Sequence, residues 1–229
     1  MVHTNQQIQI VVKSIKQETP HYLTLTFERP RGFTYQAGDW IDLEFEGGEL
    51  RGGKTYSLSS SPTEADMTIT FKEGLSPLKK ALATVSAGDE LTIVQYGNDY
   101  GFQLNETKAS TLIAGGVGIA PFRSMIKEMV DQGYKNSVEL IYLNQTDTFL
   151  FQEELVQWKK QLPSLMVHYV ITKDLKRKQR EKTMRTLITD TNRRYYIAGP
   201  PGMVLTTTAF ITDIGVQERN IKIDSFGGY

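Results

Sequence analysis

The pattern of apolar residues changes character near residue 105. Before that point, short runs rich in β-branched and aromatic residues alternate apolar with polar positions, as strands with one buried face do. Turn signals separate these runs, and a helical pattern occurs only at residues 76–85, with Ser76 as N-cap and Pro77 in the first turn. Many strands with one short helix predict a closed antiparallel β-barrel over residues 1–105.

After residue 105, strand-like and helix-like segments alternate. Runs typical of buried strands, such as 111–115 and 138–144, are followed by amphipathic segments of helical length. This alternation predicts right-handed crossovers and a parallel sheet that helices cover on both faces. We therefore predict a second domain, residues 106–229, with an α/β Rossmann-like fold.

The composition excludes several kinds of site. The chain contains no cysteine, so it can form no disulfide, zinc thiolate, cysteine nucleophile or cysteine-bound iron–sulfur cluster. His3, His21 and His168 have no metal-ligand spacing, and we expect no metal site. Trp40 and Trp158 are interpreted as packing residues.

Charge is balanced over the chain but not within it. The formal net charge is zero, which gives no reason to expect nucleic acid or a membrane as a partner. Residues 1–105 hold 9 basic and 13 acidic side chains, whereas residues 106–229 hold 17 and 13, so a phosphorylated ligand is expected in the second half. The sequence shows neither a spanning apolar run of ~18 residues nor a signal-peptide core, so we expect a cytoplasmic protein.

Two glycine-rich segments follow strands of the second domain. Residues 111–122 place Gly115, Gly116 and Gly118 between a strand and a helix, where backbone N–H groups can bind a pyrophosphate. The spacing matches neither G-x-G-x-x-G nor a P-loop, and a tight turn that needs small residues explains it equally well. Residues 195–204 form a second such loop, and the pair favours an extended ligand.

Six motifs in order resemble the ferredoxin–NADP reductase family over essentially the whole chain. The flavin signature R-x-Y-S-x-x-S corresponds to residues 54–60, with lysine in place of arginine, and the second flavin segment corresponds to FKEGLSPLKKAL. GDELTIVQYGNDYGFQL resembles the end of the family's barrel. AGGVGIAPF and AGPPGM resemble its nucleotide loops, and IDSFGGY resembles its acid-x-aromatic ending.

The resemblance implies a barrel that binds FAD and a Rossmann-like domain that binds NADPH or NADH. Tyr56 would lie against the isoalloxazine, and Ser57 would hydrogen-bond near the nitrogen that accepts the hydride. Lys54 and N–H groups around Gly74 and Ser76 would hold the pyrophosphate. The implied catalytic residues are Ser57, Asp224 and Tyr229. The implied cofactor contacts are Lys54, Thr55, Tyr56, Ser57, Leu58, Ser59, Ser60, Lys72, Gly74, Leu75 and Ser76 in the barrel, and Gly115, Gly116, Val117, Gly118, Ile119, Pro121, Asn144, Gly199, Pro200, Met203, Phe226 and Tyr229 in the second domain.

Two residues near the C-terminal end keep alternative interpretations. By resemblance, Tyr229 would stack on the flavin and move aside for nicotinamide, carried by Gly227 and Gly228; it could also pack into the barrel as an end-cap or be disordered. Asp224 would orient the nicotinamide and share a proton route with Ser57, or it is an ordinary solvated carboxylate at a strand end.

The chain departs from the family pattern at several positions. Lys54 offers a point charge instead of the planar fork of arginine, so we expect weaker FAD retention, with Arg51 as a possible aid. Ala198 replaces a cysteine that often precedes G-P. Asn144 stands where a residue selects the coenzyme, without a clear signal for either one. The basic residues of 172–185 would contact a 2′-phosphate, dock an acidic protein or remain solvated, and we lean slightly to NADPH.

The function that we predict is an FAD-dependent NAD(P)H oxidoreductase that passes electrons to a separate acceptor. The acceptor would be a protein of the ferredoxin or flavodoxin type or a small molecule. One alternative is a reductase that uses free flavin or ferric iron as substrate. The other is a non-catalytic nucleotide-binding subunit.

Overall fold

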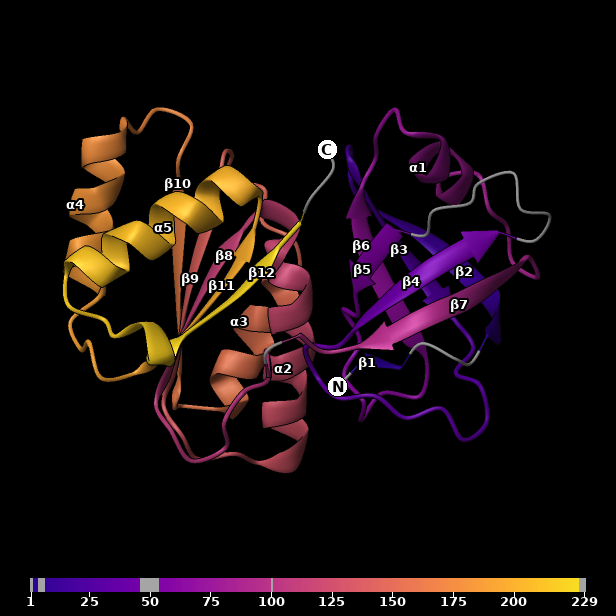
Figure 1. The fold of residues 1–229 in the computed structure, drawn as a ribbon, viewed down its shortest axis with the longest axis horizontal. Coiled ribbons are helices and arrows are strands. Elements are labelled where there is room, and N and C mark those ends of the chain that lie inside the picture. Colours follow the sequence, from indigo (N-terminus) through magenta and orange to yellow (C-terminus); the bar gives the residue numbers. More distant parts are fainter. Residues whose placement is uncertain (1, 4–6, 46–53, 100, 227–229) are drawn as a thin grey trace. The chain divides into compact units, whose positions relative to one another are not determined.

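A computed structural model describes residues 2–3, 7–45, 54–99 and 101–226. The chain divides into two compact units, each with one sheet (Figure 1). The first unit comprises Met1–Gln103 and Ala120–Asp131, and the second comprises Leu104–Ile119 and Gln132–Tyr229. A helix that follows the first glycine loop therefore groups with the first unit, and the domain boundary at residue 105 stays a prediction.

The sheet of the first unit is antiparallel throughout. Its strand order is β5-β4-β7-β2-β3-β6, and β1 pairs with β7. A bridge between Leu58 and Ile69 joins the two ends of this order, so the sheet closes on itself and the predicted barrel is confirmed. The strands are β1 (Val2–His3), β2 (Ile8–Thr19), β3 (Tyr22–Phe27), β4 (Trp40–Phe45), β5 (Lys54–Ser57), β6 (Met67–Lys72) and β7 (Glu90–Gly97).

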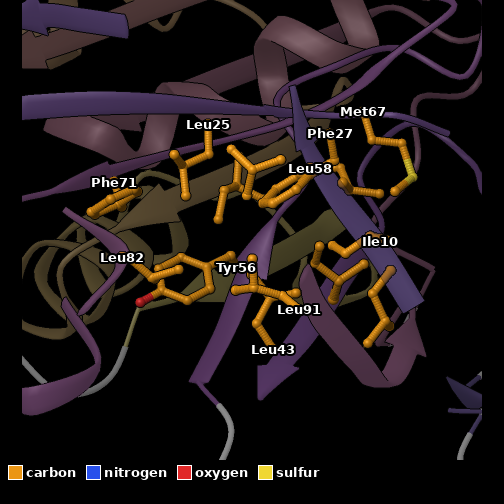
Figure 2. Close-up of a cluster of buried hydrophobic side chains, with 14 of the residues drawn as sticks. Ile10, Leu25, Phe27, Leu43, Tyr56, Leu58, Met67, Phe71, Leu82 and Leu91 are labelled. Carbon is orange, nitrogen blue, oxygen red and sulfur yellow. The ribbon is translucent and has the colours of Figure 1, made fainter. Parts of the chain in front are cut away.

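Alternate residues of the strands fill the barrel. On β6, for example, Met67, Ile69 and Phe71 are buried, and side chains from β2 to β7 meet them (Figure 2). The helix α1 (Pro77–Leu82) adds Leu78 and Leu82 to this core. Its predicted start is confirmed, since the Ser76 hydroxyl accepts a hydrogen bond from the Lys79 N–H and proline opens the helix.

The sheet of the second unit is parallel, in the order β10-β9-β8-β11-β12, which confirms the predicted α/β architecture. Its strands are β8 (Ser110–Gly115), β9 (Val138–Asn144), β10 (Leu165–Ile171), β11 (Arg194–Gly199) and β12 (Ile221–Ser225). The helices after β8 are η1 (Gly116–Gly118), α2 (Ile119–Gln132), α3 (Gln152–Gln161), α4 (Arg177–Leu187), α5 (Pro201–Asp213) and η2 (Glu218–Asn220).

Helices α4 and α5 share one hydrophobic core with the parallel sheet, and α5 crosses in front of the strands in Figure 1. Met184 of α4 and Ile211 of α5 belong to this core together with Ile113, Ile141 and Ile197 of the strands. The sequence pattern predicts no helix in the basic stretch 172–185, but α4 covers most of it. Within the described ranges, no helix is both long and apolar enough to span a membrane.

Candidate functional site

The two predicted glycine loops meet at the carboxyl edge of the parallel sheet. Strands β8 and β11 are neighbours in this sheet and end at Gly115 and Gly199. A Cβ atom on Gly199 would lie 3.1 Å from the Gly115 carbonyl oxygen, so the two backbones are in contact. The sequence predicts both loops, and the strand order brings them side by side.

The backbone of the first loop has little freedom. Gly116 has a φ of 54°, in the left-handed region, and its carbonyl accepts a hydrogen bond of 3.1 Å from the hydroxyl of buried Tyr142. A Cβ on Gly118 would lie 2.1 Å from the Ala198 carbonyl oxygen. Close packing alone therefore requires glycine at position 118. This agrees with the interpretation of the loop as a tight turn that needs small residues.

The same edge presents the start of a long helix. Helix α5 follows Gly199 directly, and no side chain caps its first turn at Pro200. Met203 reaches back from this turn, since its Cε atom would lie 2.6 Å from a Cβ on Gly115. Uncapped N–H groups at a helix N-terminus, beside a backbone without side chains, suit an anionic ligand such as a pyrophosphate.

Asn144 and the basic stretch lie at neighbouring strand ends. The side-chain amide of Asn144 donates to the Thr148 carbonyl at 2.7 Å. The backbone carbonyl of Asn144 accepts from the Thr172 N–H, also at 2.7 Å. Lys173 follows at once and is exposed, as are Lys176 and nearly all the basic residues of α4. The amide of Asn144 thus shapes its own loop, and exposed cations stand beside it.

The acidic residue of the C-terminal strand lies beside the second glycine loop. In β12, Asp224 is the register partner of Ala198, and both Asp224 and Phe226 are half-buried. The Phe226 N–H donates to the Gly199 carbonyl at 3.1 Å. Tyr229, the predicted lid, lies outside the described residues, and its role stays a prediction.

In the barrel, Tyr56 points inward. It pairs with Ile41 across β4 and β5, is 7% exposed, and packs edge-on against Phe71 with ring centroids 5.9 Å apart (Figure 2). Burial raises the pKa of its hydroxyl, which has no hydrogen-bond partner among the described residues. Buried hydroxyls are rarely left unpaired, so this one marks a place where a polar group of a ligand would fit.

The residues after Tyr56 are largely enclosed by the barrel itself. Ser57 is buried opposite Trp40, and Leu58 lies in the core. The Ser59 hydroxyl contacts the Thr68 hydroxyl at 2.8 Å, and the Ser60 hydroxyl accepts from the Thr68 N–H at 2.9 Å. These side chains close the barrel, and a contact with a cofactor stays a prediction for each of them.

The second predicted flavin segment is more open. Lys72 and Ser76 are exposed, Leu75 is 88% exposed, and Gly74 lies under the side chain of Lys79. Thr55 is also exposed, on the outer face of β5, and donates to Asp42 at 2.6 Å. The side chain of Lys54 lies outside the described part of the structure.

Arg123 and Glu64 form an ion pair that the sequence does not predict. The two guanidinium nitrogens of Arg123 lie 2.8 and 3.1 Å from the two carboxylate oxygens of Glu64. One of these nitrogens also donates to the Ser59 carbonyl at 2.9 Å, and the neighbouring Ser124 hydroxyl donates to the Ser60 carbonyl at 2.6 Å. Helix α2 therefore fixes the segment that follows Tyr56. The pair is 59 residues apart in sequence, and no local pattern predicts it.

A buried carboxylate, Asp39, lies just before β4. It is 7% exposed, its Oδ2 accepts from the Gln36 N–H at 2.8 Å, and its carbonyl accepts from the Leu58 N–H at 2.9 Å. Burial raises the pKa of Asp39 in the folded protein, so folding binds a proton at pH values between the unfolded and folded pKa. Stability is therefore lost as the pH rises through this window. Above the folded pKa the buried carboxylate is charged, and its burial destabilises the folded protein.

Asp39→Asn is expected to raise the Tm at pH 8 by about 2–4 °C, which corresponds to about 1 kcal/mol in a chain of this size, because it removes a buried charge and keeps an oxygen that can accept from the Gln36 N–H. The gain should shrink as the pH falls through the raised pKa of Asp39, because the carboxyl group then binds a proton and loses its charge in the folded protein. Thermal unfolding at a series of pH values measures it. Asp89→Asn is the matched control, since exposed Asp89 accepts from the Ser86 N–H at 2.8 Å in an equivalent turn. Equal shifts for both variants would contradict the explanation by burial.

Comparison with known proteins agrees with this geometry. Residues 112–208 match the model of the oxidoreductase NAD-binding domain. The chain is 24% identical over 244 residues to a flavohemoprotein of Bacillus cereus, with 95% of this chain and 60% of that protein covered. It is 27% identical over 214 residues to the sulfhydrogenase 2 subunit gamma of Pyrococcus furiosus, with 85% and 73% covered.

Among solved structures, a ferredoxin NADP+ reductase from Neisseria gonorrhoeae with bound FAD and NADP has the same fold. The TM-score is 0.79 at 20% identity, with 96% of this chain and 98% of that chain covered. The chain thus spans only about 60% of the flavohemoprotein but nearly all of this reductase. Residues 112–208 thus match an oxidoreductase NAD-binding domain, and the fold of the chain is that of this ferredoxin NADP+ reductase.

Proposed function

We propose that this protein is an FAD-dependent oxidoreductase that takes a hydride from NADPH or NADH and passes electrons to a separate acceptor. The observation that carries the proposal is the meeting of the Gly115–Gly118 and Gly199–Met203 loops at the carboxyl edge of a parallel sheet. Open α/β sheets bind nucleotides at this edge. The match of residues 112–208 to an oxidoreductase NAD-binding domain supports the same assignment.

One feature of the barrel, the buried hydroxyl of Tyr56, fits a bound FAD. The buried Tyr56 hydroxyl lacks a partner among the described residues, and a ribityl hydroxyl or phosphate oxygen would supply one. Lys54 and the N–H groups near Gly74 and Ser76 would hold the pyrophosphate. When bound, FAD would supply the centre that accepts a hydride and releases electrons singly or in pairs.

The remaining roles are positional. The glycine loops and the α5 N-terminus would hold the phosphates of NAD(P)H, and Ser57 with Asp224 would orient the reacting rings. Alignment of two rings in contact supplies much of the rate of such a transfer. Tyr229 would cover the flavin until nicotinamide arrives.

The acceptor and the coenzyme are finer proposals. The relatives include a flavohemoprotein and a sulfhydrogenase subunit, which do not share one evident acceptor. The exposed basic face of α4 suits an acidic electron carrier of the ferredoxin or flavodoxin type as well as a small molecule. The exposed cations beside Asn144 favour NADPH, because a 2′-phosphate attracts them. Steady-state kcat/KM values with both nucleotides test this preference. We also propose a cytoplasmic location, which cell fractionation checks.

Anaerobic reduction of the purified protein tests the central proposal. The protein should be yellow, carry FAD after gel filtration at less than one per chain, and lose its flavin absorbance when NADPH or NADH is added. A colourless protein that reduces added FMN or riboflavin would support the free-flavin reductase instead. A yellow protein that neither nucleotide bleaches would overturn the proposal in favour of a non-catalytic subunit. Free FAD mixed with each nucleotide is the blank.

A further inference from the structure

Strand β12 forms one edge of the parallel sheet. It is the last strand in the order β10-β9-β8-β11-β12, and in the part of the chain that the structure describes no strand pairs with the side of β12 that faces away from β11. Its register with β11 has no bulge, and the strand IKIDS contains no proline. Bulges and prolines are devices that protect an edge strand, because unpaired backbone groups bind other strands.

The register fixes which backbone groups face this open edge. The Phe226 N–H donates to the Gly199 carbonyl of β11 at 3.1 Å. The N–H and C=O groups of successive residues in a strand point to opposite neighbours, so those of the residues two and four positions before Phe226 also face β11. The groups at the open edge belong to the alternate residues of β12, which are Ile221, Ile223 and Ser225.

An apolar side chain stands at the centre of this edge. Ile223 is 48% exposed, and it is the register partner of buried Ile197. It therefore lies on the sheet face that α5 covers, and Figure 1 shows α5 beside β12. Leu205 of α5 is 72% exposed. Exposed apolar side chains next to unpaired backbone groups favour contact with another strand.

The charges of β12 complement each other about Ile223. Lys222 precedes Ile223 and Asp224 follows it, and both side chains lie on the other face of the sheet. In a two-fold antiparallel pairing centred on Ile223, Lys222 of each copy lies directly opposite Asp224 of the other. Opposite charges at such positions stabilise a strand pair. A pairing centred on Ile221 or Ser225 would form neither of these charge pairs.

We propose that two copies of the chain pair through β12 in a two-fold antiparallel arrangement that joins their parallel sheets into one. Ile223 would bond to its equivalent, and Ile221 of each copy to Ser225 of the other, so the backbone groups at the open edge all gain partners. Lys222 of the second copy would then stand opposite Asp224, the residue proposed to orient the nicotinamide. The pairing itself does not depend on that role.

Light scattering of the full chain during gel filtration, over about a hundredfold range of protein concentration, tests the proposal. The mass should rise from 25.9 kDa towards twice that value. Ile223→Lys sets two like charges opposite each other and should raise the dimer Kd at least about 10-fold. Met166→Lys is the matched control, because Met166 is 44% exposed on β10 at the other edge of the sheet, and it should leave the Kd unchanged.

Single cysteines test the register, since the chain has no cysteine of its own. The Cα atoms of a directly hydrogen-bonded antiparallel pair lie about 5.5 Å apart, within the range of a disulfide. Mild oxidation should therefore link Ile223→Cys into a covalent dimer and leave Met166→Cys monomeric. Lys222→Asp should weaken the dimer, and Asp224→Lys added to it should restore the affinity, because opposite charges again face each other.

Three results would overturn the proposal. The first is a wild-type chain that stays monomeric at every concentration. The second is a dimer whose Kd Ile223→Lys leaves unchanged or Met166→Lys raises equally. The third is a dimer in which Ile223→Cys forms no disulfide and the exchange of Lys222 and Asp224 restores nothing, since the two copies would then meet through another surface. Circular dichroism of each variant shows whether its fold is kept, and half-exposed positions such as 223 and 166 tolerate lysine.

Discussion

Gly118→Ala is expected to lower the Tm by about 5–10 °C and to weaken NAD(P)H binding strongly. The added methyl group would meet the Ala198 carbonyl oxygen at 2.1 Å and the Gly199 nitrogen at 2.8 Å. Both are backbone atoms of β11 and its loop, so no side chain can turn away, and the loop must move. Overpacking of this kind costs about 2–3 kcal/mol, or about 2–4 °C for each kcal/mol in a chain of this size.

The same displacement would reach the nucleotide. A shift of about 1 Å in a positioning loop can reduce a rate by about 100-fold, so kcat/KM for NAD(P)H should fall by that order. The measurements are thermal unfolding and anaerobic reduction by increasing NADPH or NADH. The fall in kcat/KM should exceed the fraction of protein that has unfolded at the assay temperature.

Gly202→Ala is the control for this variant. Gly202 lies in the other glycine loop, in the first turn of α5, and a Cβ there would have no atom within 4 Å. Alanine favours a helix over glycine, so the Tm should stay the same or rise slightly. If Gly118→Ala unfolds at the same temperature as Gly202→Ala, the contact between the two loops is not what makes glycine necessary.

The positions of the two glycine loops are predictable from the sequence, but the contact between them is not. The motif places small residues at two strand ends, and the alternating pattern predicts a parallel sheet, so the position of the loops follows from the sequence. The contact between Gly118 and Ala198 does not follow, because it depends on β8 and β11 being neighbours. The motif alone therefore left the tight-turn and ligand interpretations open.

The fold was predictable where burial gives a clear period. Strand β9 coincides with the predicted run 138–144, and α2 ends before Gly133, whose φ is 66°. Helix α4 was missed because the only buried residue between its ends is Met184, so basic residues conceal the helical period. Helix α3 begins at Gln152, and the two buried apolar residues Phe149 and Leu150 precede it in the chain.

The barrel signature was harder to interpret than the loops. The resemblance implies that Tyr56 contacts the flavin, which stays a prediction, and the pairing of Tyr56 with Ile41 sets its ring against the core of the barrel. Register decides which face of a strand a residue occupies, and a motif carries no register. Long-range polar contacts such as those of Arg123 are likewise invisible in a single sequence.

Arg123→Ala is expected to destabilise the protein by about 3–5 kcal/mol, which corresponds to a fall in Tm of about 10 °C or more. The side chain of Arg123 is 11% exposed and that of Glu64 is 26% exposed. Removal of the guanidinium would leave a largely enclosed carboxylate unpaired and would free the Ser59 carbonyl. Thermal and urea unfolding measure the loss.

Three further variants distinguish the contribution of the Arg123–Glu64 ion pair to stability from that of other charges on α2. Lys127→Ala breaks an ion pair with Asp131 four residues along the same helix and should cost no more than about 1 kcal/mol. Arg123→Lys keeps the charge but loses the bidentate geometry, so its stability should fall between the two. Arg123→Met combined with Glu64→Gln should be more stable than Arg123→Met alone, because no charge is left unpaired.

The arginine also has a consequence for FAD. Arg123 and Ser124 hold the carbonyls of Ser59 and Ser60, and this segment follows Tyr56 and Ser57 without a break. FAD retention should therefore drop in Arg123→Ala at temperatures where the protein is still folded, and Lys127→Ala should retain FAD like the wild type. Loss of stability with unchanged FAD retention would show that α2 supports the fold of the barrel but not its flavin segment.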